Sequence, residues 1–163
     1  MLKDLLQGRF MNHPLHPLLV HLPIGLWVGS VIFDIAFMAN HQPTVAGASF
    51  FCILVGVIGA IIAAPAGLAD YFTVPSNTVP KRLATAHMLL NFAIIGIYSI
   101  NLFTRYRMLD GVPTEVTGGQ LFLSLLSIVL LGVSGYLGGL LVFEYGIGFR
   151  SSERDDAPKH KAA

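Results

Sequence analysis

Apolar residues are gathered into four long runs that are separated by short polar stretches. The runs cover residues 17–39, 46–68, 83–104 and 120–143, and each is 22 to 24 residues long. Because an α-helix rises about 1.5 Å per residue, each run can cross a hydrocarbon layer of roughly 30 Å. The pattern therefore predicts four membrane-spanning helices.

The four runs lack the charged face of a soluble helix. Apart from cysteine and tyrosine, their only ionisable side chains are His21, Asp34 and His87, whereas a surface helix of a soluble bundle normally has a charged side. The composition agrees, because 54% of the residues are hydrophobic and only 12% are charged, about half the usual charged share. We predict an all-α integral membrane protein in contact with the lipid bilayer.

Short connections fix the order of the helices. The connecting segments cover roughly residues 40–45, 69–82 and 105–119, so consecutive helices should be antiparallel neighbours in an up-down four-helix bundle. We expect one transmembrane domain over 13–149, preceded by an interfacial amphipathic segment at 1–12. The polar tail at 150–163 is expected to be disordered.

Positive charge is distributed unequally between the two ends of this bundle. Eight lysines and arginines lie on the side that holds both termini, and two, Arg105 and Arg107, lie on the other side. Cytoplasmic loops carry an excess of lysine and arginine. We therefore expect both termini to be cytoplasmic.

Several functional classes are excluded by residue type. The single Cys52 allows no internal disulfide and no paired-thiol metal or redox motif. A net charge of +1 implies no attraction to nucleic acid. The sequence contains none of the GxSxG, HExxH and phosphate-loop patterns of hydrolases and nucleotide-binding proteins.

The predicted topology brings histidines to one edge of the membrane. His13, His16 and His21 open the first helix, Asp70 follows the second helix, and His87 lies near the start of the third. Pro23 removes a backbone hydrogen bond, which predicts a kink or a late helix start near His21. Polar backbone groups at that depth are tolerated where they face protein, a cofactor or water.

The second half of the chain resembles the first in its sequence pattern. Each half has a histidine-bearing helix followed by a helix rich in small residues, and the halves end in GLADY (67–71) and GGLLVFEY (138–145). Asn91 shares a helix face with His87. Small residues at four-residue spacing serve close helix packing or offer a flat face to a planar cofactor.

Three ordered motifs carry a family resemblance. The stretches HPLHPLLVHLPIGLW, GLADY followed by KRLATAHMLLN, and GYLGGLLVFEYGIGF resemble the bacterial membrane family called domain of unknown function 2231, over about residues 13–149. The resemblance implies a four-helix domain of the bacterial cytoplasmic membrane. Some members of the family are joined to Rieske-type or cytochrome-like modules, which implies electron transfer.

These observations support three functional hypotheses. The first is a redox protein that holds haem b between His21 and His87, with Lys81 and Arg82 at the propionates and Asn91 or Asp70 orienting a ligand ring. Its electron partners would be a redox protein or a quinone.

The second hypothesis is a copper, iron or zinc site. Its ligands would be drawn from His13, His16, His21, His87 and Asp70. The third is a cofactor-free subunit or anchor of a larger complex, and a homo-oligomer is compatible with each. Asp34 is interpreted as a protonated carboxyl group that is hydrogen-bonded to serine or threonine on a neighbouring helix.

Overall fold

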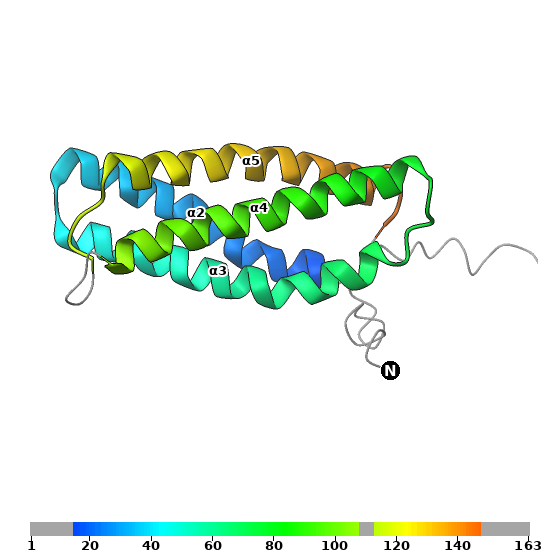
Figure 1. The fold of residues 1–163 in the computed structure, drawn as a ribbon, viewed down its shortest axis with the longest axis horizontal. Coiled ribbons are helices and arrows are strands. Elements are labelled where there is room, and N and C mark those ends of the chain that lie inside the picture. The colour runs from blue at the N-terminus through cyan, green and yellow to red at the C-terminus, as the bar shows by residue number, and fades with distance from the viewer. Residues whose placement is uncertain (1–14, 108–112, 148–163) are drawn as a thin grey trace, which may run out of the picture.

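The computed structural model describes residues 15–107 and 113–147, which form four helices labelled as in Figure 1. These are α2 (Leu15–Asn40), α3 (Pro43–Tyr71), α4 (Val79–Arg107) and α5 (Gly118–Phe143). All four are long and apolar enough to cross a membrane. The predicted all-α four-helix bundle is confirmed, and the segments predicted at 1–12 and 150–163 lie outside the described residues.

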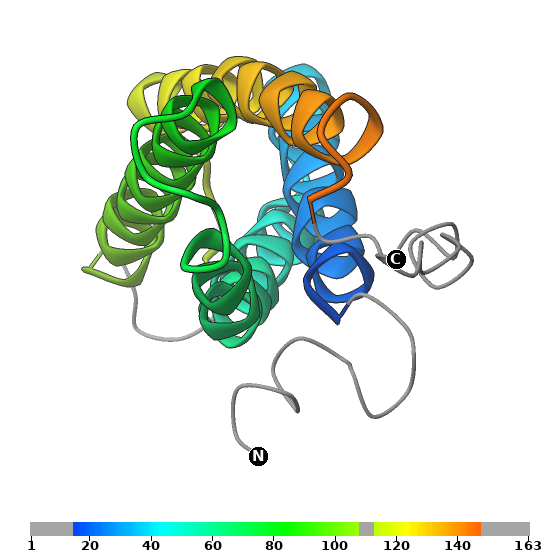
Figure 2. The same ribbon diagram turned by 90° about the vertical axis from the view of Figure 1, so that its right-hand side faces the viewer.

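The helices run alternately up and down along one long axis and are arranged in a ring when viewed along that axis (Figures 1 and 2). Helix α2 packs most extensively against α3, and α4 packs against α5. Smaller contacts of α3 with α4 and of α2 with α5 close the ring. The bundle is therefore two helical hairpins placed side by side.

Local sequence signals set several helix ends. Helix α3 begins with Pro43 directly after the short connection at His41, whose φ of 52° lies in the left-handed region. Helix α5 begins with a capping box, in which the Thr117 side chain accepts from the Gln120 backbone and the Gln120 side chain accepts from the Thr117 backbone. Helix α2 begins at Leu15 and continues through Pro23, so the late start near His21 was wrong.

Polar side chains lie inside the bundle and large apolar ones lie outside. Among the described residues, the buried polar and charged side chains include Ser30, Asp34, Ser49, Asn101, Arg105, Gln120, Ser124, Ser127 and Ser134. Many leucine, isoleucine, valine and phenylalanine side chains are exposed on all four helices. This distribution suits a protein whose outer surface meets lipid, because polar groups there would have no partner.

A constant sequence offset relates the two hairpins. Trp27 contacts Tyr98 and Asp34 contacts Arg105, and the members of both pairs are 71 residues apart. The same offset relates His16 to His87. Each of these histidines bonds to a residue 47 positions further along the chain. The internal sequence similarity thus corresponds to an approximate two-fold relation between α2–α3 and α4–α5. Residues that are 71 positions apart meet between the two hairpins.

Candidate cofactor cavity

A cavity of about 320 Å³ lies inside the half of the bundle where α2 begins and α3 ends. All four helices contribute to its wall, which is mostly apolar. Its polar side chains are His16, Asp70, Tyr71, His87 and Asn91. Cavities of roughly 300–1,000 Å³ with a few placed polar groups are typical of small-molecule and cofactor sites.

His16 reaches the cavity from α2 and is fixed by α3. Its Nδ1 lies 3.2 Å from the backbone oxygen of Ala63. The ring lies against Gly67, where a Cβ atom would come within 2.7 Å of the imidazole. Gly67 therefore makes room for the ring, and the Ala63 carbonyl sets its orientation.

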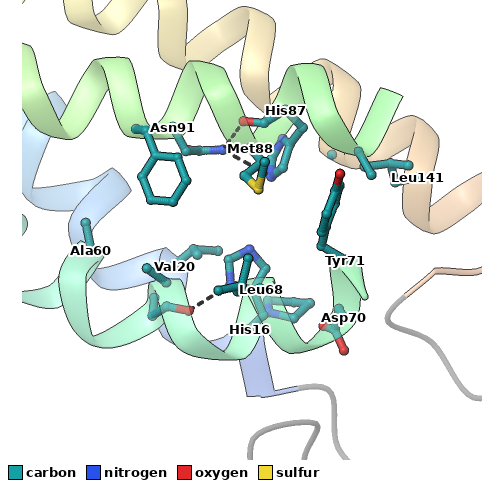
Figure 3. Close-up of a pocket in the computed structure, with 18 of the residues that line it drawn as sticks. His16, Val20, Ala60, Leu68, Asp70, Tyr71, His87, Met88, Asn91 and Leu141 are labelled. Carbon is teal, nitrogen blue, oxygen red and sulfur yellow. Dashed lines mark hydrogen bonds between the residues drawn. The ribbon is translucent and has the colours of Figure 1, made fainter. Parts of the chain in front are cut away.

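His87 is held in the same way by the second hairpin. Its Nδ1 lies 2.8 Å from the backbone oxygen of Ser134 on α5. A Cβ atom at Gly138 would come within 3.0 Å of the ring. Figure 3 shows the His16 and His87 rings on opposite walls of the cavity.

The hydrogen bonds determine which nitrogen of each ring carries the proton. A backbone carbonyl only accepts, so Nδ1 of His16 and Nδ1 of His87 each donate a proton to it. In a neutral imidazole the other nitrogen, Nε2, then carries a lone pair that can accept a hydrogen bond or bind a metal. Donation of Nδ1–H to a carbonyl is also how metal-binding histidines are commonly oriented.

Asn91 lies one turn after His87 on α4 and contacts that ring. Its amide nitrogen is 3.1 Å from His87 Nε2, 2.8 Å from the His87 backbone oxygen and 2.8 Å from Ser134 Oγ. Figure 3 shows this amide beside the His87 ring at the cavity wall. The prediction that His87 and Asn91 share a face is confirmed.

Lys81 lies at the end of the cavity, where α3 ends. Its Nζ donates to the Tyr71 backbone oxygen at 2.9 Å and lies 3.4 Å from the centre of the Tyr71 ring. Tyr71 itself lines the cavity and bonds through its hydroxyl to Thr85. Lys81 is thus close to the cavity, whereas the neighbouring Arg82 is exposed.

The structure does not bring His21 together with His87. His21 is exposed and does not line the cavity. The cavity wall of α2 follows His16, Val20, Pro23 and Trp27 at helical spacing. Because each residue turns the helix by about 100°, a position five after His16 lies well away from that stripe. The place expected for His21 is taken by His16.

The predicted metal site is only partly assembled. His13 lies outside the described residues. His16, His87 and Asp70 all line the cavity. Within residues 15–107 and 113–147, however, no group of three histidine, cysteine or acidic side chains is close enough to hold a metal ion. A site built from protein ligands alone is therefore not supported in this part of the chain.

A buried ion pair, which the sequence reasoning missed, lies beyond the cavity. Arg105 Nη2 donates to Asp34 Oδ2 at 2.7 Å, and both side chains are fully buried. Asp34 also accepts from Ser49 and Ser124, so the predicted bonds to serine are confirmed. The salt bridge to Arg105 contradicts the predicted protonated carboxyl group. Arg105 was placed in a loop because the apolar run ends at 104, but α4 continues to Arg107.

Two aromatic rings are stacked on each other. Along α2 and along α4, each of them comes after the cavity histidine and before the residue of the ion pair. The rings of Trp27 and Tyr98 are 4.6 Å apart and nearly parallel. Trp27 also lines the cavity and lies against Gly56. Trp27 Nε1 and Ser127 Oγ are buried and have no hydrogen-bond partner among the described residues.

Comparison with known proteins identifies the family. Neither a curated protein nor a solved structure matches the chain. Residues 12–151 match the family described as predicted membrane protein, DUF2231. This match covers most of the chain, including every described helix. The protein therefore belongs to the DUF2231 family of predicted membrane proteins.

Proposed function

We propose that the cavity holds a b-type haem with His16 and His87 as axial ligands, and that the protein carries electrons in the membrane. The observation that carries the proposal is the related placement of the two imidazoles. Each donates Nδ1–H to a carbonyl of its own hairpin and lines the cavity from an opposite wall. Haem iron is ligated by such nitrogens in many electron-transfer proteins.

Haem suits this donor set better than a bare ion. His16 and His87 supply two nitrogen ligands, whereas a structural zinc site needs about four. A porphyrin supplies its own ring nitrogens and has an apolar body, which matches the apolar cavity wall. The glycines at 67 and 138 allow both rings to pack closely against the opposite helix of the same hairpin.

Lys81 is the proposed partner of a haem propionate. It is half-buried and contacts Tyr71 at the end of the cavity. A carboxylate there would replace or join its bond to the Tyr71 carbonyl through a stronger, charge-assisted bond. Arg82 is exposed, so we assign this role to Lys81 alone.

The proposal includes a place and an orientation in the cell. The family resemblance and the lysine and arginine distribution support the bacterial cytoplasmic membrane with both termini inside. The cavity would then lie near the cytoplasmic edge, where a redox protein or a membrane quinone exchanges electrons with the haem. Protease accessibility of tags at both termini in inverted and right-side-out vesicles tests this orientation.

A visible difference spectrum tests the haem. The full chain is expressed with a haem precursor, purified in detergent, and measured as dithionite-reduced minus oxidised, with haem quantified against protein. We expect one haem per chain and a sharp α band. His16→Ala should lose haem, and His87→Ala should lose the low-spin band.

His21→Ala is the matched control, because His21 lies on the same helix but is exposed. It should leave the spectrum unchanged. A folded, monodisperse protein without haem under these conditions would overturn the proposal, and so would a spectrum that depends on His21 and not on His16.

A further inference from the structure

The two hairpins differ in the residue that lies next to each cavity histidine. Asn91 follows His87 by four residues, and the position four after His16 is Val20. Both residues line the cavity. One imidazole therefore has an amide beside it and the other has an apolar side chain.

The Asn91 amide acts on the ligating nitrogen of His87. Because His87 Nδ1–H is donated to the Ser134 carbonyl, its Nε2 accepts from Asn91 Nδ2 at 3.1 Å. The two hydrogens of the amide face three acceptors, and the contact to Nε2 is the longest of the three. The hydrogen bond to Nε2 can be lost while the two shorter contacts keep the amide satisfied.

Within residues 15–107 and 113–147, no amide lies beside His16 Nε2 in this way. Its hydrogen bond runs from Nδ1 to Ala63, and among the bonds found in the described residues none engages its Nε2. Its lone pair is thus available without breaking a bond to another described residue. Ligation by His87 costs a hydrogen bond, whereas ligation by His16 does not.

We propose that Asn91 makes His87 a replaceable ligand, so that the iron is held firmly by His16 and exposes a second position to small external ligands. This inference rests on the proposed haem. The exchange would be a ligand substitution: the bond between iron(II) and His87 Nε2 would break, a bond from iron to the carbon of carbon monoxide would form, and His87 Nε2 would accept a hydrogen bond from the Asn91 amide. No electron and no proton is transferred.

Carbon monoxide binding to the reduced, full-length holoprotein tests this role. After laser photolysis, carbon monoxide should rebind to the unmodified protein. Asn91→Val places at this position the residue found beside His16. Without the amide, the released form of His87 loses its hydrogen bond, so carbon monoxide association should slow by roughly fivefold to tenfold. Asn91→Leu, which is closer in size, should act in the same direction.

Val20→Asn is the reciprocal variant. It places an amide four residues after His16 and should accelerate carbon monoxide association by making the second histidine replaceable. Absorption spectra of the reduced variants report the fraction with a free iron position independently of stability. This fraction should fall in Asn91→Val and rise in Val20→Asn.

The outcomes separate this inference from the proposed function. Haem with an unchanged association rate and spectrum in both Asn91 variants would overturn the role of Asn91 alone. A reduced holoprotein that binds no carbon monoxide would overturn it as well. Absence of haem from the unmodified protein would overturn both proposals.

Discussion

Asp34 on α2 and Arg105 on α4 form an ion pair that joins the two hairpins inside the bundle. Their closest atoms are 2.7 Å apart, and both side chains are fully buried. Serines on α3 and α5 complete the network, because Ser49 and Ser124 both donate to Asp34. All four helices therefore meet at one charged centre, and neither charge could remain there without the other.

Removal of one charge from this pair should destabilise the bundle strongly. Asp34→Ala leaves Arg105 buried without its carboxylate, which costs about 3–5 kcal/mol in soluble proteins. We expect a similar loss for Arg105→Ala. Thermal unfolding in detergent, followed by circular dichroism, measures the effect. Arg82→Ala, which removes an exposed charge from the same helix as Arg105, should leave the unfolding temperature nearly unchanged, and an equal loss in this control would contradict the assignment.

Much of the fold could be predicted because its main signal is simple. Four apolar runs of more than twenty residues predicted four spans, and the helices contain them. Helix ends were harder to predict. Arg105 is charged, so the apolar run in the sequence ends before it. The helix nevertheless continues with Arg105 buried, because Asp34 on α2 compensates its charge. A local pattern contains no information on such a distant partner.

Only some of the polar residues that line the cavity could be selected from the sequence. His87 and Asn91 were identified from their helical spacing, which a sequence shows directly. His16, which lines the cavity, was not paired with His87 because depth was judged from the apolar run alone, and that run begins at 17. The 71-residue offset is the signal that could have selected His16 over His21, since it pairs His16 with His87.

Close packing of the histidines against glycine gives a second prediction. A Cβ atom at Gly67 would lie 2.7 Å from the His16 ring, and one at Gly138 would lie 3.0 Å from the His87 ring. Gly67→Ala should therefore displace His16 and lower the occupancy of the proposed haem more than Gly138→Ala lowers it. Gly139→Ala serves as the control, because nothing lies within 4 Å of a Cβ atom there. Haem content per protein, measured by the pyridine haemochrome assay, decides the order, and full occupancy in Gly67→Ala would contradict it.

The stacked aromatic pair gives a third prediction with a direct optical readout. Trp27 is the only tryptophan in the chain, so tryptophan fluorescence reports this one site. Near-ultraviolet circular dichroism reports the packing of the indole together with that of the tyrosines. A Cβ atom at Gly56 would lie 2.5 Å from Trp27 Nε1. Gly56→Ala should push the indole out of its stack with Tyr98 and change the near-ultraviolet signal.

The matched substitution for this experiment is Gly25→Ala on α2, where a Cβ atom meets nothing within 4 Å. Its near-ultraviolet spectrum should equal that of the unmodified protein. Identical spectra for Gly56→Ala and Gly25→Ala would show that the indole is not confined as described.

The approximate two-fold relation gives the last prediction, which concerns exchange of the two charges. If Asp34 and Arg105 occupy related positions between the hairpins, the pair should tolerate reversal. Asp34→Arg alone places two cations together in the bundle and should prevent folding. Asp34→Arg combined with Arg105→Asp restores an ion pair between the same two positions, and their buried surroundings remain polar on both sides. We expect the double variant to recover a monodisperse, helical protein with a lower unfolding temperature, because Ser49 and Ser124 are arranged for a carboxylate on α2.

Size-exclusion chromatography in detergent and thermal unfolding measure the recovery. A double variant that folds no better than Asp34→Arg would mean that the two positions are not interchangeable and that the offset of 71 residues has no structural equivalence at this level of the bundle.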